Sequence, residues 1–212
     1  MISDTKVVAI GGGTGLSTML KGLKLHTHNI TAVVTVADDG GSSGILRSDL
    51  GMLAPGDVRN CVSALAEVDP VMGELLNFRF KDGSLKGHSL GNLFLAALNE
   101  TSSSFDEAVK KFSHLAGVVG TVYPVTNESV TLSALLEDGR LIEGESHIGV
   151  HHDGPKNGIV KLMVNPEKPK AVDGVIKALE KADIIVLGPG SLYTSIIPNL
   201  LVDGVVDAIK KS

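Results

Sequence analysis

The sequence predicts an α/β protein with a Rossmann-like three-layer fold around a mainly parallel sheet. β-branched runs at residues 6–10 and 30–36 flank a stretch, residues 16–23, in which leucines recur at helical spacing. Such a β-α-β unit is normally parallel and right-handed. A further apolar run at residues 184–187 ends, like the first, in a glycine-rich turn, as expected where strands of an open α/β sheet meet a ligand crevice.

Composition indicates a globular protein and excludes several classes. The 212 residues, 43% apolar and 20% charged, suit one domain spanning residues 1–212. A net charge of −5, two Tyr and no Trp argue against nucleic acid as a partner. The single cysteine, Cys61, excludes an internal disulfide. No apolar run approaches the roughly 20 residues of a membrane span and no signal-peptide pattern is present, so we expect a cytoplasmic protein.

The middle of the chain is expected to hold a long loop followed by three helices. Residues 38–56 are rich in glycine and predict a long loop. Helices are expected over residues 57–65 and 89–99, and a third follows a capping box formed by Ser104 and Glu107. The side chains expected on the buried face of the second helix are Leu90, Leu93, Phe94, Ala97 and Leu98.

The second half of the chain predicts a β-rich insertion and a return to the α/β pattern. A hairpin signal at Asp138-Gly139 and a short apolar run at residues 159–164 indicate an insertion within residues 118–165. His151-His152-Asp153 is interpreted as a solvated loop. A helix near residues 172–179, a buried strand at 184–187 and a helix at 205–211 complete the chain.

Two glycine turns are candidate phosphate sites. The first offers Gly12, Gly13, Thr14 and Gly15 between a strand and a helix, and the second offers Gly188, Pro189, Gly190 and Ser191. Glycines admit a ligand close to the backbone, and helix N-termini offer free N–H groups to an anion. The first turn lacks the dinucleotide pattern, because Leu16 replaces the third glycine, and it lacks a P-loop lysine. The alternative is a pair of tight turns; two such turns in one parallel sheet favour a shared crevice.

The polar run after residues 30–36 contains Asp38, Asp39, Ser42 and Ser43. The two carboxylates fit either Mg²⁺ held together with phosphate oxygens or hydrogen bonds to sugar hydroxyls. Neighbouring strand residues point to opposite faces, so the two need not share a role. A solvated turn capped by an aspartate is the alternative.

Two further helix starts carry polar candidates. Asp57, Arg59 and Asn60 begin one helix, where Arg59 is suited to hold a phosphate with both arms of its guanidinium. Asp57 fits a metal ligand beside Asp39 or, equally, a helix cap. His88 and Asn92 lie one turn apart at the start of an apolar helix, where an anion-binding and a capping role are both open.

Five ordered blocks resemble one family closely. They are GGGTGLS at 11–17, VADDGGSSG at 36–44, PGDVRN at 55–60, GHSLGNL at 87–93 and LGPGSLYTS at 187–195. The resemblance is to the gluconeogenesis factor family (YvcK-like), a branch of the CofD-like superfamily that also holds 2-phospho-L-lactate transferase. It covers essentially the whole chain.

The resemblance implies a Rossmann-like fold and two functions. One is a regulatory protein that binds UDP-N-acetylglucosamine and is needed for normal cell shape during gluconeogenic growth. The other is a Mg²⁺-dependent transferase that moves a phospholactyl group from a guanosine diphosphate donor to a deazaflavin. The scarcity of aromatic residues favours the regulator, and a homo-oligomer and cell-envelope regulatory partners are open hypotheses.

The resemblance also assigns residues and shows two departures. Asp39 and Asp57 match the metal-site acids of the transferase, and residues 12–15 and 188–191 match its phosphate-facing loops. Ala54 stands where the family usually has proline. Family members continue well beyond Ser212, so the C-terminal part of the family fold is expected to be absent.

Overall fold

The computed structural model describes residues 3–67, 69–150 and 157–212, so the predicted loop at 151–153 lies outside the described residues. The strands are β1 (Val7–Gly11), β2 (Ile30–Val34), β3 (Thr121–Pro124), β4 (Thr131–Leu136), β5 (Leu141–Glu143), β6 (Ile159–Asn165) and β7 (Ile184–Leu187). The helices are α1 (Gly13–Leu23), α2 (Gly41–Leu50), α3 (Gly56–Leu65), α4 (Pro70–Asn77), α5 (Leu90–Glu100), α6 (Phe105–Leu115), α7 (Glu145–Gly149), α8 (Asp173–Leu179), α9 (Ile197–Leu200) and α10 (Val205–Lys211), with a π-helical turn η2 (Leu192–Ile196).

The main sheet has four parallel strands in the order β3-β2-β1-β7. Gly11, at the end of β1, lies opposite Val34 of β2, and Ile10 lies opposite Leu187 of β7. The carboxyl ends of these three strands are therefore level. The segments that follow them along the chain emerge side by side at one edge of the sheet.

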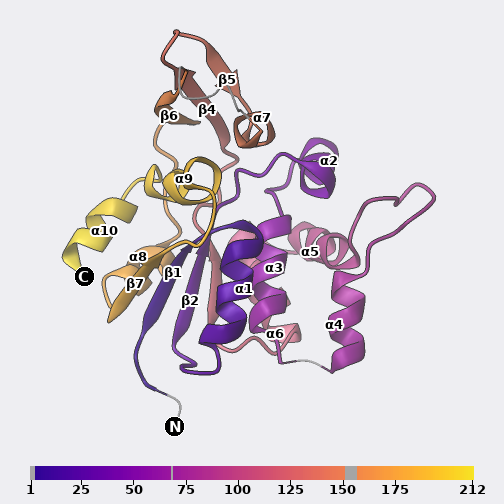
Figure 1. Cartoon of the computed structure of the whole chain (residues 1–212). Helices are drawn as coiled ribbons and strands as arrows, with labels where there is room; N and C mark the ends of the chain where they lie inside the picture. Colours follow the sequence, from indigo (N-terminus) through magenta and orange to yellow (C-terminus); the bar gives the residue numbers. More distant parts are fainter. Residues whose placement is uncertain (1–2, 68, 151–156) are drawn as a thin grey trace.

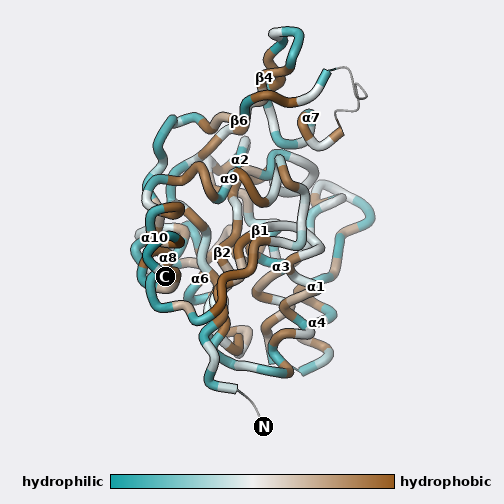
Figure 2. The backbone as a smooth tube through the Cα atoms, turned by 60° about the vertical axis from the view of Figure 1, so that its left-hand side comes forward, coloured by the Kyte–Doolittle hydropathy of each residue, from teal (hydrophilic) through white to brown (hydrophobic). Residues whose placement is uncertain are grey.

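Helices cover both faces of this sheet, which confirms the three-layer α/β fold (Figures 1 and 2). Alternate residues of the strands point to opposite faces. Ala9 and Ala32 pack against α1, α3, α5 and α6, whereas Val8 and Ile10 pack against α8 and α10. The helix expected after the capping box is α6, and its apolar side chains from Phe105 to Phe112 on one face are buried.

A second, antiparallel sheet with the order β5-β4-β6 stands beyond the main sheet (Figure 1). The β4–β5 hairpin confirms the turn signal, because Gly139 adopts a φ of 85° that only glycine accepts readily. The strand β3 lies within residues 118–165, but it pairs with β2 in the main sheet. The β-rich insertion therefore begins after Pro124.

The predicted loop at residues 38–56 is wrong in its middle, because α2 occupies it. Glycine-rich sequence disfavours a helix locally, but tertiary contacts override this preference. Ser42 and Ser43 are buried and hydrogen-bonded to residues of other helices, and Leu46 packs into the core. Gly51, with a φ of 64°, ends the helix.

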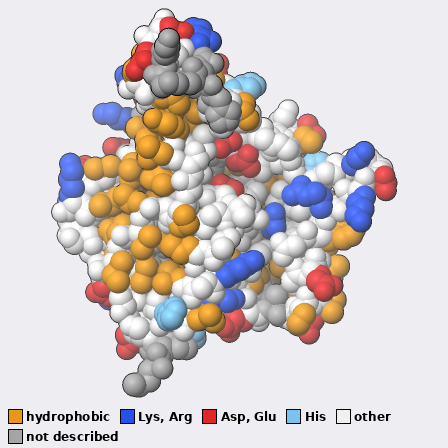
Figure 3. All heavy atoms as spheres, in the orientation of Figure 1, with side chains coloured by type: hydrophobic (Ala, Val, Ile, Leu, Met, Phe, Trp, Pro, Cys, Tyr) orange, Lys and Arg blue, Asp and Glu red, His pale blue; other side chains and the backbone are white. Residues whose placement is uncertain are grey.

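Two predicted burial patterns also differ from the structure. In α5 the buried residues include Asn92, Leu95 and Ala96, whereas Phe94 is 40% exposed, because the helix turns a polar side chain inward. The strand β7 was expected to be buried, but Ile184 and Leu187 are each 50% exposed. β7 lies at an edge of the described sheet, and hydrophobic side chains gather on this face of the molecule (Figure 3).

None of the helices formed by the described residues has both the length and the apolar character needed to cross a bilayer.

Candidate functional site

The two glycine turns touch each other at the carboxyl edge of the main sheet. A Cβ atom added at Gly15 would lie 3.1 Å from the carbonyl oxygen of Pro189, and one added at Gly190 would lie 3.5 Å from that of Gly12. Larger residues at Gly15 would push the turns apart. The turns that follow β1 and β7 thus lie against each other at this edge of the sheet, and the ligand crevice between the strand ends stays a prediction.

The exposed parts of these turns are backbone and small polar groups. Thr14, Pro189, Gly190 and Ser191 are exposed, and Gly12, which precedes α1, makes no side-chain cap. The first turn of a helix leaves backbone N–H groups without intrahelical partners. An anion at the start of α1 would meet such N–H groups and the positive end of the helix dipole.

Asn199 links the end of β1 to η2, close to the two turns, and sequence analysis missed it. Its Nδ2 donates to the carbonyl oxygens of Gly11 at 3.1 Å and Ser195 at 2.7 Å, and the residue is fully buried. Its Oδ1 is buried without a hydrogen-bond partner among the described residues. The only sequence signal was a polar residue in an apolar segment, which is too common to single it out.

Asp57 reaches from the start of α3 to the first glycine turn. A Cβ added at Gly12 would lie 2.6 Å from its Oδ2, and the carboxylate accepts a hydrogen bond from the backbone of Gly13. Burial and the charge of Asp38 raise the pKa of Asp57 to about 6, against the effect of the Gly13 bond. Asp57 is not the cap of its own helix, since Pro55 holds that position.

Asp39 has a structural task that the sequence did not indicate. Its Oδ2 and Oδ1 accept hydrogen bonds from the backbone N–H groups of Glu145 and Ser146, both at 2.9 Å. Burial alone would raise the pKa of Asp39, but these bonds hold it below its ordinary value. Asp39 thereby anchors the start of α7, and with it the insertion, to the crevice.

The insertion in turn brings Glu145 to the site, another residue that sequence analysis missed. Burial raises the pKa of Glu145, a hydrogen bond with Thr194 opposes this, and the charges of Asp38 and Asp39 raise it further. Figure 3 shows acidic side chains gathered in the hollow beneath the antiparallel sheet. Local sequence gave no signal, because Glu145 lies 106 residues from Asp39 and only folding brings them together.

The predicted metal pair of Asp39 and Asp57 fits a cation only in part. No group of three or more His, Cys, Asp or Glu among the described residues is arranged to hold a metal ion. Both oxygens of Asp39 already accept backbone hydrogen bonds, whereas the ionised form of Asp57 is disfavoured by Asp38. A cation beside Asp57 would relieve that repulsion, and Mg²⁺ in such a site draws its remaining ligands from phosphate and water.

Four predicted residues form a buried hydrogen-bonded chain across three helices. Arg59 Nε donates to Asn92 Oδ1 at 3.3 Å, and Asn92 Nδ2 donates to Ser42 Oγ at 3.1 Å. Ser42 Oγ lies 3.0 Å from His88 Nδ1. Arg59, Asn92, Ser42 and His88 are each less than a tenth exposed. Burying these polar groups is tolerable only because each has a partner.

The direction of this chain favours one histidine tautomer. A guanidinium only donates, so Asn92 must turn its oxygen to Arg59 and its amide to Ser42. Ser42 Oγ accepts from Asn92 and keeps one proton to donate, and we assign that proton to the bond with Nδ1 of His88. With this assignment, neutral His88 carries its proton on Nε2.

Arg59 is a buried cation paired with amides. Its second partner is Asn77 Oδ1, at 2.8 Å from Nη1, and no ion pair of Arg59 is found among the described residues. Burial and the neighbouring Arg79 lower the pKa of Arg59, which stays far above neutral for a guanidinium. A Cβ added at Gly91 would lie 2.9 Å from Arg59 Cδ, so α5 must pass close by. Asn60, half-buried on α3, makes no side-chain hydrogen bond to another described residue.

Ser43 and Asp38 link this buried chain to the glycine turns. Ser43 Oγ accepts a hydrogen bond from the backbone N–H of Gly56 at 3.2 Å. Asp38 Oδ1 accepts from Gly40 at 3.0 Å, and its Oδ2 would lie 3.2 Å from a Cβ at Gly56. With Asp57 beside Gly12, the structure brings the predicted residues, apart from Asn60, close together at the carboxyl edge of the sheet.

Comparison with protein families gives one match over almost the entire chain. The profile described as 2-phospho-L-lactate transferase CofD matches residues 7–212. A relative from Thermoanaerobacterium thermosulfurigenes is 57% identical over 211 residues, which are 100% of this chain and 65% of the relative. A Bacillus subtilis protein named gluconeogenesis factor is 47% identical over 210 residues, 98% of this chain and 64% of its own length.

A crystal structure of a Bacillus halodurans protein superposes on this fold with a TM-score of 0.93 at 46% identity. The match covers 99% of this chain and 67% of the other. This chain thus spans about two thirds of these relatives, and 47% of the length of a Clostridium acetobutylicum relative that is 53% identical.

Proposed function

Because this chain belongs to the CofD family, in its gluconeogenesis-factor branch, we propose that the crevice binds a nucleotide sugar of the UDP-N-acetylglucosamine kind. The protein then acts as a cytoplasmic regulator needed for normal cell shape during gluconeogenic growth. The observation that carries the proposal is the contact between the two glycine turns at the ends of β1 and β7. The Bacillus subtilis relative, whose name is gluconeogenesis factor, supports the regulatory side.

The chemistry of the crevice suits the parts of such a ligand. Two glycine turns and the start of α1 offer N–H groups to a diphosphate. Carboxylates at Asp38 and Glu145 suit the hydroxyls of a sugar, since they accept hydrogen bonds. Arg59 has amide partners and no ion pair among the described residues, and a guanidinium so placed favours an anion nearby.

The second candidate is a Mg²⁺-dependent transferase of a phospholactyl-type group from a nucleoside diphosphate donor. The name of the matching family, a phospholactate transferase, supports it, and so does the raised pKa of Asp57. If Mg²⁺ binds, Asp57 is the better candidate ligand, because both oxygens of Asp39 already accept backbone hydrogen bonds, and the metal would neutralise charge on the diphosphate. Asp39 would then position the insertion and would not coordinate the ion.

Calorimetric titration of the full-length protein tests both candidates. We expect UDP-N-acetylglucosamine to bind more tightly than GDP or NAD. Tight binding of GDP that depends on Mg²⁺ would favour the transferase, and no binding of any of the three would reject both. Turnover with a deazaflavin acceptor would contradict the regulator as a complete account.

A matched pair of threonines on α1 makes the test specific to the glycine turn. Thr14 and Thr18 are both exposed, but Thr18 lies one turn further from Gly12. We expect Thr14→Ala to weaken nucleotide-sugar binding about tenfold, which corresponds to one hydrogen bond of about 1.4 kcal/mol, and Thr18→Ala to leave it unchanged. Equal effects of the two substitutions would place the ligand elsewhere.

A further inference from the structure

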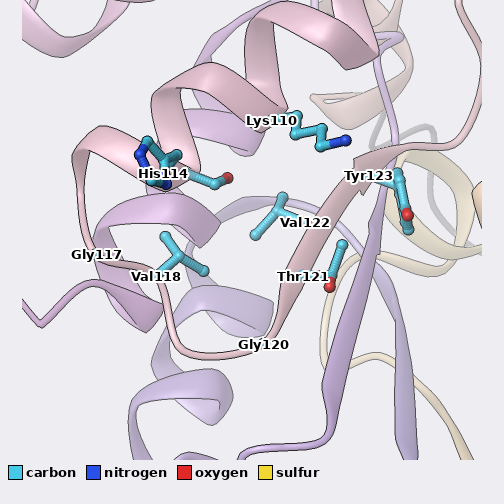
Figure 4. A pocket seen from close by; sticks show the side chains of 9 residues that line it. Lys110, His114, Gly117, Val118, Gly120, Thr121, Val122 and Tyr123 are labelled. Atoms are coloured by element: carbon cyan, nitrogen blue, oxygen red, sulfur yellow. The ribbon is translucent and has the colours of Figure 1, made fainter.

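Two cavities flank β3 at the end of the sheet opposite the crevice. One, of about 360 Å³, lies between α6 and β3 and is lined by Lys110, His114 and hydroxyl-bearing residues (Figure 4). The other, of about 320 Å³, lies where β1 and β2 begin, beside α8. Both are lined by Gly120 and Thr121, so they adjoin at the start of β3.

The lining of these cavities is one-sided in charge. Lysines at positions 6, 110, 177 and 181 face them, and none of the described residues that line them is acidic. The whole chain carries more acidic than basic residues, with a net charge of −5. An excess of lysine in one place is therefore a local feature, and it creates a positive potential at the two cavities.

Nearby acids form no ion pair with these lysines among the described residues. Glu180 pairs with Lys211, and Asp183 accepts the backbone N–H of Lys6. Lys177 and Lys181 are four residues apart at the end of α8, a spacing at which like charges repel. Cations favour the last turn of a helix, which accounts for Lys177 but not for Lys110 or Lys6.

An unpartnered hydroxyl lies beside the first cavity. Ser113 lines this cavity, and its Oγ is buried without a hydrogen-bond partner among the described residues. Leaving a buried polar atom unpaired costs about 1–3 kcal/mol, and a rotation of the Ser113 side chain toward an anion in the cavity would give Oγ a partner. Ser113 and Lys110 are three residues apart on α6 and so share a face of the helix.

We propose that the two cavities together form a binding site for a small anion that carries two separated phosphate or carboxylate groups. One group lies near Lys110 and Ser113, and the other lies near Lys6, Lys177 and Lys181. Gly120 forms the ridge between the cavities and has no side chain to block a bridging ligand. A larger residue is excluded there, because its Cβ would lie 2.5 Å from the carbonyl oxygen of Ile30.

Calorimetric titration of the full-length protein with a hexose bisphosphate, citrate, pyrophosphate and inorganic phosphate tests this site. We expect a bisphosphate or tricarboxylate to bind more tightly than inorganic phosphate, and the binding to weaken as salt rises. A preference for citrate would assign carboxylate chemistry to the site, and a preference for the bisphosphate would assign phosphate chemistry. Absence of binding by all four probes at low salt would overturn the proposal.

Variants separate this site from the crevice and from general charge effects. The double variant Lys110→Ala, Lys181→Ala removes one lysine from each cavity and is expected to weaken binding at least tenfold. The control Lys81→Ala, Lys86→Ala removes two exposed lysines from the segment between α4 and α5 and is expected to change it less than twofold. Equal losses in the two variants, or no loss in either, would contradict the proposed location.

Ser113→Ala distinguishes a ligand site from a structural surface. The substitution removes an unpaired buried hydroxyl, so we expect the free protein to unfold at an equal or higher temperature while its affinity for the anion falls. Reduced affinity together with reduced stability would indicate a structural role for Ser113 and count against the site.

Discussion

The two ends of the main sheet carry positive charge in opposite ways. At the carboxyl end, Arg59 is 7% exposed and is held by the amide oxygens of Asn92 and Asn77. At the amino end, four lysines are exposed around two cavities. A buried guanidinium with fixed partners discriminates by geometry, whereas exposed ammonium groups act through a field that salt screens.

The difference teaches where mutations will be costly. At the carboxyl end each polar group depends on the next, so one substitution leaves several buried atoms unpaired. At the amino end each lysine has water as an alternative partner. Effects there are expected to be small, additive and dependent on salt, while effects in the crevice are expected to be large and insensitive to salt.

Replacing Arg59 gives the largest expected effect. Arg59→Met leaves the oxygens of Asn92 and Asn77 without their donor, and we expect the free energy of unfolding to fall by about 2–4 kcal/mol. Nucleotide-sugar affinity is expected to fall by about a hundredfold or more. Urea denaturation and calorimetry measure the two. Arg59→Lys keeps the charge but loses the planar guanidinium. Full nucleotide-sugar affinity of that variant would therefore contradict a geometric role for Arg59.

Replacing Asp57 tests the acidic part of the crevice through pH. Its pKa is raised from 3.8 to about 6, so ionisation destabilises the fold: the stabilising effect is complete below pH 3.8 and is lost as pH rises through about 6. Asp57→Asn removes this dependence. We expect the variant to be more stable than the parent by about 2–3 kcal/mol above pH 7 and equally stable near pH 3.5, by urea denaturation.

A lower stability of Asp57→Asn at neutral pH would contradict the raised pKa of Asp57. Such a result would mean that the carboxylate is stabilised in the fold, as Asp39 is, and that its ionised form is already compensated. We also expect the variant to bind ligand less tightly while it gains stability, a combination typical of a group kept for function.

Replacing Gly12 tests the close approach of the first turn to α3. The Cβ of Gly12→Ala would lie 2.6 Å from both Asp57 Oδ2 and Thr35 Cγ2, so we expect a loss of about 1–3 kcal/mol. The control is Gly22→Ala, near the other end of the same helix, where nothing lies within 4 Å. That change should stabilise the protein by about 0.5–1 kcal/mol, and thermal unfolding compares the two variants.

Replacing Ser42 gives the sharpest spectroscopic effect. The hydrogen-bonded chain predicts that neutral His88 carries its proton on Nε2, which ¹⁵N chemical shifts of the imidazole report at alkaline pH. Ser42→Ala should abolish this preference. Ser43→Ala, which removes the neighbouring hydroxyl bonded to Gly56, should preserve it. A proton on Nδ1 in the parent protein would contradict the direction assigned to the chain.

Much of the fold followed from local patterns. The periodic runs predicted β1, α1, β2, α3, α8 and α10, because alternating or helical burial needs apolar residues at fixed spacing. The sequence predicts a loop where α2 forms, because glycines and serines disfavour a helix unless contacts with other helices stabilise it. The burial of Phe94 was predicted wrongly, because α5 turns Asn92 toward Arg59.

The candidate site, like the fold, could be predicted from the sequence only in part. The glycine turns at residues 12–15 and 188–191 were predictable, because a run of glycines after a strand has few purposes other than close approach. Asn199 and Glu145 were not predictable: one is a single polar residue in an apolar segment, and the other comes from the insertion. The structural role of Asp39 was not predictable either, because it depends on where α7 begins.

The sequence by itself determined the fold class, the family and the two turns that open the crevice, since these depend on residue type and spacing along the chain. Tertiary structure decided which carboxylate is hydrogen-bonded by the backbone and which has a raised pKa, that Ser42 meets His88, and that lysines far apart in sequence surround two adjoining cavities. Those properties depend on distances between segments, and burial strengthens every electrostatic interaction that such distances create.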